Sequence, residues 1–418
     1  MKNFRKARAV ALSLLLAVSA QATEPVPSGF GSSLPELLNW AENNSPMVNA
    51  MRFEAQARQQ QVTMAGALED PMFKVEWMDI DKNRPTLAPN EVGAMQYTLT
   101  QPLPLWGKRD LKAQAAQASA DAAGNTVVST RAQLRAEIRQ AYAQWYRALA
   151  SLRINREQAA LLRQMEMSAS QRYAVGKAMQ SEALRLQMEL SMLANEALGL
   201  QNSVEQSRAA LAAWLNVAPS ELKGAPQQLP APVPGKDAST WLDEARARNP
   251  ELAAVRKEIE AARARLDLAR LNSRPGLNVG VSGKQMGNKL TNYGLMLEFQ
   301  IPLQQGAKNA EQSEALAMLM KAQADEQNRL RMIERDVQQM NAMAGTAQRQ
   351  LELLDKTLLP QAELTLQSAL AGYAAGRSEF SMLLEAQQQI RRLRQMRLMA
   401  EVDTFTAASG LQKMMGDQ

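Results

Sequence analysis

The amino-acid sequence predicts an α+β membrane protein that is internally duplicated and supplies four β-strands of membrane length per chain. The first supporting observation is a repeated pentad, YAVGK at Tyr173–Lys177 and YAAGR at Tyr373–Arg377, whose copies lie 200 residues apart. The second is that a long helix-forming stretch precedes each pentad. The third is a pair of segments before each long stretch in which apolar and polar residues alternate, as they do in β-strands.

The amino terminus, residues 1–22, is typical of a bacterial secretory signal peptide. A basic start precedes a 12-residue apolar run, Ala9–Ala20, which is too short to span a bilayer of about 30 Å as a helix. A retained membrane anchor is the alternative. Because residues 1–22 hold four basic and no acidic residues, their removal lowers the formal net charge from +6 to +2. We therefore expect no nucleic-acid partner.

The chain contains no histidine and no cysteine. This composition excludes thiol chemistry and histidine general bases, and it removes the usual ligands of structural zinc sites. Carboxylates alone provide little catalytic chemistry. We therefore expect no enzymatic activity, no catalytic or metal-ligating residues and no cofactor.

The first repeat, 23–224, begins with a helix-forming segment between Pro46 and Pro71, because a proline begins or ends a helix. A β-hairpin is expected over 72–101, with a polar, turn-rich loop at 81–91. One face of its strands is apolar and the other is polar. The apolar residues are Phe73, Val75, Trp77, Met95, Tyr97 and Leu99.

The second repeat, 238–418, follows a Pro-rich linker at 225–237 and has the same organisation. Its first helical segment lies between Pro250 and Pro275, which are 25 residues apart like their counterparts. A β-hairpin is expected over 277–301, with its loop at 283–290. The apolar face of this hairpin consists of Leu277, Val279, Val281, Tyr293, Leu295, Leu297 and Phe299.

Each hairpin is followed by a proline that ends the strand and a glycine that introduces a long helix. In QPLPLWGKR these strand-to-helix junction residues are Pro104 and Gly107, and in QIPLQQGAK they are Pro302 and Gly306. The pentad glycines lie 69 and 70 residues further on, so each helix would be close to 100 Å long at about 1.5 Å per residue.

The two pentads are expected to form the tips of helical hairpins. Gly176 and Gly376 permit a left-handed turn there, and Lys177 suits the carbonyl groups at a helix end. Returning helices are expected over 181–215 and 380–411. Pro360 should bend or interrupt the second long helix, and the first has no counterpart.

Four strands cannot close a membrane barrel, since the smallest bacterial barrels have about eight. Unpaired backbone groups in hydrocarbon are costly, so copies of the chain are expected to share one barrel of 8, 12 or 16 strands. The apolar faces would meet lipid and the polar faces would line a lumen. A soluble β-sandwich or sheet covered by helices is the alternative.

The arrangement resembles the TolC-type outer-membrane efflux channels, and PLPLWGKR looks most like their heavy-metal branch, the partners of Cus- and Czc-type exporters. The resemblance covers essentially the whole chain after residue 22. It implies a homotrimer with a 12-stranded β-barrel in the outer membrane and a long α-helical barrel in the periplasm. It also implies that the tips dock a periplasmic adaptor (a membrane fusion protein) and an inner-membrane RND-type pump.

In this family acidic residues six and nine positions after the tip glycines ring the closed mouth. The resemblance therefore marks Glu182 and Glu385 as gate candidates, with Met382 standing where a second acidic residue would be. Arg377 is a further candidate, as a tie between neighbouring helices. Ordinary exposed helix charge is the alternative for both glutamates. We expect Tyr173 and Tyr373 to pack at the tips, where the adaptor would dock.

The sequence leaves three hypotheses open for the function of the protein. The first is a conduit for heavy-metal cations, the second is a channel for drugs or a type I secreted protein, and the third is a periplasmic adaptor. The chain holds 24 methionines, and thioethers suit Cu(I) or Ag(I). Methionine is also a good helix former and a flexible packing residue, and that account is favoured.

Overall fold

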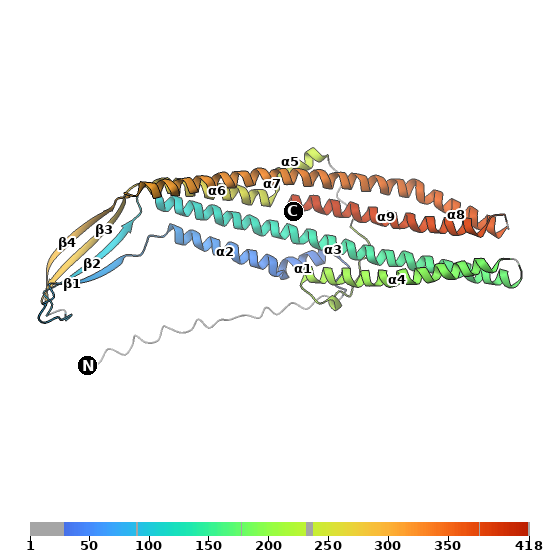
Figure 1. Cartoon of the computed structure of the whole chain (residues 1–418), viewed down its shortest axis with the longest axis horizontal. Helices are drawn as coiled ribbons and strands as arrows, with labels where there is room; N and C mark the ends of the chain where they lie inside the picture. Colours follow the sequence, from blue (N-terminus) through green and yellow to red (C-terminus); the bar gives the residue numbers. More distant parts are fainter. Residues whose placement is uncertain (1–28, 89–90, 177, 231–236, 376, 417–418) are drawn as a thin grey trace.

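The computed structural model describes residues 29–88, 91–176, 178–230, 237–375 and 377–416. The predicted signal peptide, 1–22, and residues 231–236 of the predicted linker lie outside these ranges. The described chain is strongly elongated, with a β-sheet at one end, two helical hairpin tips at the other and long helices between them (Figure 1). Within the described residues, no helix is long and apolar enough to cross a membrane.

The order of elements repeats, as the duplication predicts. The first half contains α1 (Leu34–Asn44), α2 (Pro46–Gly66), β1 (Met72–Met78), β2 (Ala94–Leu103), α3 (Lys108–Ala174), α4 (Gln180–Leu215) and the short 3₁₀ turn η1 (Pro219–Glu221). The second half contains α5 (Ala238–Arg248), α6 (Pro250–Leu271), β3 (Gly276–Met286), β4 (Lys289–Gln300), α7 (Gln305–Leu353), the π-helical turn η2 (Leu354–Leu358), α8 (Leu359–Ala374) and α9 (Phe380–Met414).

The four strands form one antiparallel sheet in the order β1-β2-β3-β4. The register aligns the apolar positions of both hairpins, so that Leu99 of β2 stands opposite both Phe73 of β1 and Val281 of β3. Val281 in turn stands opposite Leu295 of β4. These side chains are exposed in the single chain, and Leu295 is 77% exposed. Much of the predicted apolar face is therefore left uncovered by the chain, although Met95 is buried.

Two details of the sheet differ from the sequence prediction. Strand β2 continues through Pro102 to Leu103, because β1 pairs only as far as Thr100 and β2 is locally an edge strand, where proline is tolerated. The loop expected at 283–290 is mostly strand, and only Gly287 and Asn288 connect Met286 to Lys289. Gly287 has a φ of 58°, which a two-residue hairpin turn requires at its first position.

The helices that precede the sheet start by the same device in both halves. Pro46 and Pro250 occupy the first turns of α2 and α6, where a missing N–H costs nothing. The preceding residues, Ser45 and Asn249, cap the helices by accepting hydrogen bonds from the backbone N–H groups of residues 48 and 252, at 3.4 and 2.9 Å. The prolines therefore mark helix starts, as the sequence predicts.

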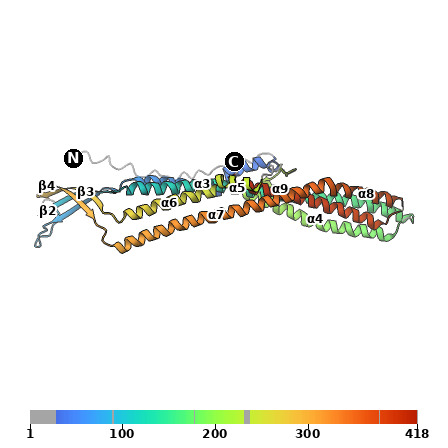
Figure 2. The ribbon, with the colours of Figure 1, turned by 90° about the horizontal axis from the view of Figure 1, so that it is seen from above.

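Four helices form a layer that extends from the sheet along the long axis (Figure 2). In this layer α2 neighbours α3, α3 neighbours α6, and α6 neighbours α7. Helix α3 has 67 residues, which corresponds to about 100 Å. Half of its 18 buried side chains are alanines, so neighbouring helices can approach closely. Towards the tips α3 packs against α4 and α9.

The second long helix is interrupted at the predicted position. Helix α7 passes into the π-helical turn η2, and Pro360 lies just beyond it in the first turn of α8. Proline lacks an N–H for the carbonyl group of Lys356, and its ring clashes with that carbonyl group in a regular helix. A widened turn accommodates the ring. Helix α3 carries no proline and runs unbroken.

The largest apolar core lies around the middle of the long axis and includes α1, which the sequence analysis missed. Phe30 and Leu37 are fully buried there against residues of α3, α4 and α9, including Tyr142 and Leu215. The Tyr142 hydroxyl donates to the backbone carbonyl of Ser32 at 2.8 Å. Helix α5 was also missed. Both helices have 11 residues, and so short an amphipathic segment gives little periodic signal.

Candidate functional site

The tips of the two helical hairpins are joined by one polar contact between predicted site residues. The hydroxyl of Tyr373, near the end of α8, donates to Oε2 of Glu182, in the first turn of α4, at 2.5 Å. Hydrogen bonds to an ionised acceptor are short and roughly twice as strong as neutral ones. The contact links the first repeat to the second at the far end of the molecule from the sheet (Figure 1).

The Tyr373 ring has two close side-chain neighbours. The Arg172 guanidinium lies 4.5 Å from the ring centroid, and the Phe380 ring lies at a centroid distance of 5.8 Å. Phe380 belongs to a small core with Leu186 and Leu384. Burial and the neighbouring Glu182 carboxylate raise the pKa of Tyr373 to about 12, so the phenol stays protonated and donates at neutral pH. Arg172 and Phe380 were not predicted from the sequence, in which Arg172 directly precedes Tyr173 and Phe380 follows Tyr373 by seven residues.

The two tips are not equivalent. Tyr173 is 46% exposed, and its hydroxyl has no hydrogen-bond partner among the described residues. Gly176 has a φ of 67° and its N–H donates to the Tyr173 carbonyl at 2.9 Å, which confirms the left-handed turn expected there. Lys177 and Gly376 lie outside the described residues. Only the second tyrosine therefore ties the hairpins together within one chain.

The remaining gate candidates lie at the surface of the single chain. Met382 and Glu385 are exposed on α9, whereas Leu383 and Leu384, which lie between them in the sequence, are buried. Arg377 is exposed, and in the described part of the chain only its backbone N–H has a partner, the Gly372 carbonyl at 2.8 Å. Their assignment as gate residues stays a prediction.

A ladder of polar contacts continues the tip contact along the helices. Gln388 on α9 donates to Glu189 on α4 at 3.2 Å, and one turn further Arg391 bonds Glu196 at 2.6 Å. These contacts join the same two hairpins as Tyr373 and Glu182. The hairpins are therefore held together by side chains at regular intervals, and separation at the tips would have to break them in turn.

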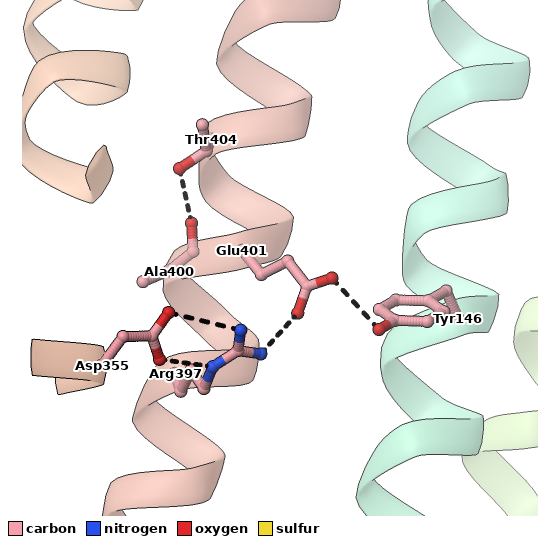
Figure 3. Close-up of polar contacts among 6 residues, drawn as sticks. All are labelled: Tyr146, Asp355, Arg397, Ala400, Glu401 and Thr404. Atoms are coloured by element: carbon pink, nitrogen blue, oxygen red, sulfur yellow. Dashed lines mark hydrogen bonds and ion pairs between the residues drawn. The ribbon is translucent and has the colours of Figure 1, made fainter. Parts of the chain in front are cut away.

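A second network lies at the π-helical turn (Figure 3). Arg397 on α9 donates to the Asp355 carboxylate of η2 at 2.6 and 3.3 Å and to Glu401 at 3.3 Å. Tyr146 of α3 donates to Glu401 at 3.1 Å. The hydrogen bond to Asp355 raises the pKa of Arg397, and burial followed by the Glu401 charge raises the pKa of Tyr146. The network ties the widened turn to a helix of each repeat.

The strand-to-helix junctions lie at the opposite end of the long helices. Gly107 precedes α3 with a φ of 78°, and the strand before it ends at Leu103, next to Pro104. Pro302 follows β4, but Gly306 lies inside the first turn of α7, so it does not introduce that helix as expected. The Trp106 indole donates to the Pro275 carbonyl at 2.9 Å, which joins the first junction to the connection between α6 and β3.

The described residues contain no group of three or more aspartates and glutamates placed to hold a metal ion. What the structure offers is a polar-faced sheet, a long helical body and a polar tie at the tips. Such an arrangement can conduct and gate, and the comparisons with known proteins identify its family. The model of the outer membrane efflux protein family matches residues 37–217 and 241–417.

The chain belongs to the outer membrane efflux protein family.

Several known proteins are similar to this outer membrane efflux protein. It is 24% identical over 317 residues, 75% of each chain, to the cobalt-zinc-cadmium resistance protein CzcC of Cupriavidus metallidurans. A solved structure of the outer-membrane channel OprN superposes with a TM-score of 0.80, 18% identity and coverage of 92% of this chain and 90% of that chain. CusC superposes with a TM-score of 0.77, 17% identity and 94% coverage of both chains. The resemblance to the outer-membrane efflux channels is confirmed by the family model, and CzcC and CusC are among the proteins to which the chain is similar.

The family places this outer membrane efflux protein in the outer membrane, as the sequence predicts. Its members are transport channels, and the adaptor hypothesis is set aside because the family model matches both repeats of the chain. The structure brings Glu182 and Tyr373 together, and it leaves Arg377, Met382 and Glu385 apart on the surface of the single chain.

Proposed function

We propose that the protein is the outer-membrane channel of a tripartite efflux system and that it exports heavy-metal cations as a homotrimer. The observation that carries the trimeric channel is a four-stranded sheet with two free edges at the end of a helical body. The observation that carries the substrate is the similarity to CzcC, whose name assigns it to cobalt, zinc and cadmium resistance.

The sheet supports closure between copies of the chain. Strands β1 and β4 each have one neighbour in the described chain, and their outer backbone groups would need partners inside a bilayer. Pairing β4 of one subunit with β1 of the next would satisfy them. Three copies then give the 12 strands that the family resemblance implies. The buried Thr98 and Thr100 lie on the opposite face from Leu99 and would face the lumen.

The helical layer has matching free edges. Helix α2 exposes Phe53 and Met64, and α7 exposes Leu316, Met318 and Met320. These are the two outer helices of the layer α2–α3–α6–α7. Packing α7 against α2 of the next subunit would cover both apolar edges and continue the barrel below the membrane.

The tips supply a surface for an adaptor and, through it, an RND-type pump. Val175 and Met179 are exposed at the first tip, and Leu184 is exposed on α4 just beyond it. Exposed apolar residues on a helical hairpin suit a partner hairpin that packs against them. Tyr173 and the ordered Gly176 turn lie in the same surface.

The positions of the methionines support the view that they are helix-forming and packing residues rather than metal ligands. Met188 and Met192 are exposed one turn apart on α4, as helix-surface residues would be. A wide passive conduit needs no tight metal site, so selection would be made by the pump. Export of drugs or of a type I secreted protein through the same architecture is the second candidate.

The test is the sensitivity of a deletion strain complemented with the wild-type gene. Growth is measured against cobalt, zinc, cadmium, copper and silver salts, and in parallel against drugs and detergents. We expect the deletion strain to lose metal resistance and complementation to restore it. Unchanged metal resistance together with drug hypersensitivity would reject the metal assignment. Native mass spectrometry of the detergent-solubilised protein tests the trimer separately.

A further inference from the structure

The strand-to-helix junctions gather cations that the channel function does not use. We name the junction cluster as Trp106, Lys108, Lys112, Arg274 and Lys308. These residues come from the ends of three elements that meet below the sheet, namely β2 leading into α3, α6 leading into β3, and β4 leading into α7. Lys108 Nζ lies 3.3 Å from the carbonyl oxygen of Arg274, to which it donates.

Positive charge exceeds negative charge in this cluster. Lys308 bonds Glu311 at 3.0 Å, and Arg109 beside the cluster lies 3.8 Å from Asp110. The remaining three cations, Lys108, Lys112 and Arg274, form no ion pair with a carboxylate among the described residues, although the Glu311 charge acts on Lys108. The cluster therefore carries more positive than negative charge, and an anion bound there would relieve the repulsion between the lysines.

The state of Lys108 agrees with this charge excess. Partial burial lowers its pKa, and the like charges of Lys308 and Lys112 lower it further, against the opposing effect of Glu311. A partly desolvated ammonium group beside two others is unfavourable unless a counter-charge is supplied.

Trp106 is held at the surface by a strained backbone. Its φ is 68°, a left-handed conformation that costs a residue with a Cβ about 1 kcal/mol or more, and Gly107 is left-handed as well. The indole N–H bonds the Pro275 carbonyl, and the Arg274 guanidinium lies 5.3 Å from the ring centroid. The ring is nevertheless 51% exposed. The geometry therefore keeps an indole and a guanidinium side by side at the surface.

The lipid-facing surface of the sheet leads directly to this cluster. Phe299 ends the apolar row of β4, and the alternation continues through Ile301 to Leu303, which is 83% exposed. Helix α7, with Lys308 in its second turn, follows at once. Apolar side chains, an exposed indole and several cations thus occur together at this end of the sheet, and these are the groups that suit the acyl chains and the anionic headgroup of a lipid.

We propose that the junction cluster binds the phosphate of an anionic phospholipid in the periplasmic leaflet of the outer membrane. Lys108, Lys112 and Arg274 contact the phosphate, Trp106 lies at the headgroup level, and Ile301 and Leu303 contact the acyl chains. The site would fix the depth at which each subunit sits in the membrane. The inference needs only the outer-membrane location of the sheet, and it holds for any exported substrate.

The test titrates the detergent-solubilised full chain with phosphatidylglycerol or with phosphatidylcholine of the same acyl chains and counts bound lipid by native mass spectrometry. The wild type should prefer phosphatidylglycerol. The double variant Lys108→Gln and Lys112→Gln should lose about fivefold of that preference for each lysine removed. The matched control is Lys257→Gln with Lys321→Gln, because these lysines lie along the helices and bond nearby carboxylates, Glu260 and Asp325.

Three results would overturn the proposal. They are a wild type without preference for phosphatidylglycerol, a double variant that keeps the preference, and a control pair that loses it equally. Displacement of the lipid by equimolar inorganic phosphate would assign the site to free phosphate instead. If the double variant does not assemble, Arg274→Gln replaces it with the same expectation. Conductance of the wild type is recorded on the same preparation, so loss of channel function is distinguished from loss of lipid preference.

Discussion

Removing the Tyr373 hydroxyl should loosen the contact between the two helical hairpins of each chain. In Tyr373→Phe the ring still packs on Phe380 and under Arg172, but Glu182 loses the donor that lies 2.5 Å from its oxygen. The variant changes one hydrogen bond and little else. It therefore tests whether that bond holds the tips in the conformation seen here.

The expected magnitude follows from the type of bond. A hydrogen bond to a charged group contributes about 1.5–3 kcal/mol. Tyr373 and Glu182 are only partly buried, so the lower value applies, and the ratio of separated to joined tips should rise about tenfold per chain. Glu182→Gln keeps an amide oxygen that can accept from the hydroxyl and removes only the charge, so it should have a smaller effect. In the Tyr373→Phe background it should add little, because the donor is already gone.

Single-channel recording in planar bilayers measures this effect. Tyr373→Phe should raise the mean conductance or the fraction of time spent in the more conductive state. Tyr173→Phe is the matched control, since it removes a hydroxyl without a partner among the described residues at the equivalent position of the first tip. If both tyrosine variants behave like the wild type, the tip contact does not restrain the channel and the reasoning is refuted.

The same contact predicts a pH dependence. The pKa of Tyr373 is raised from the ordinary tyrosine value of 10.0 to about 12, so the contribution of its protonated form is complete below about pH 10 and is lost as the pH rises through 12. Conductance controlled by this phenol should therefore not change between pH 7 and pH 9. A step in that range which Tyr373→Phe abolishes would contradict the assignment.

Three further perturbations have defined outcomes. Arg377→Ala combined with Glu385→Ala should raise single-channel conductance if these residues narrow the mouth, as the family resemblance implies. Leu295→Lys places a charge on the lipid-facing side of β4 and should cost about 2–4 kcal/mol at mid-membrane, which would be seen as loss of assembled channel in outer-membrane fractions. Asp355→Asn should weaken the bond to α9 at the π-helical turn and lower the thermal unfolding temperature by a few degrees at most, since the pair is partly exposed.

Each of these has its own control. Asn292→Lys lies on the opposite face of β4 and should assemble normally, so equal loss in both lysine variants would argue against the assignment of the two faces. Lys356→Gln removes an exposed pair with Glu352 in the same turn and should leave the unfolding temperature unchanged. For the double alanine variant, conductance equal to that of the wild type would remove both residues from the gate.

The sequence by itself determined the repeat, the strands and the helix ends. Proline and glycine restrict or free the backbone locally, so Pro46, Pro250 and Pro360 could be placed on helix starts and on the interruption without knowledge of the fold. The alternation of apolar and polar residues likewise indicated which face of each strand is apolar and which is polar. The short helices α1 and α5 were not predicted, because a segment of 11 residues has too few turns to show a periodic pattern.

Only the tertiary structure decided which distant residues meet. Tyr373 and Glu182 are 191 residues apart, and nothing in either pentad distinguishes the tyrosine that bonds across the hairpins from Tyr173, which remains exposed. Trp106 and Arg274 are joined by the packing of two separate junctions. Such pairs depend on how two long helical hairpins lie against each other. That relation is set by the sum of many small contacts along helices that are about 100 Å long, at about 1.5 Å per residue. No local sequence pattern encodes that sum.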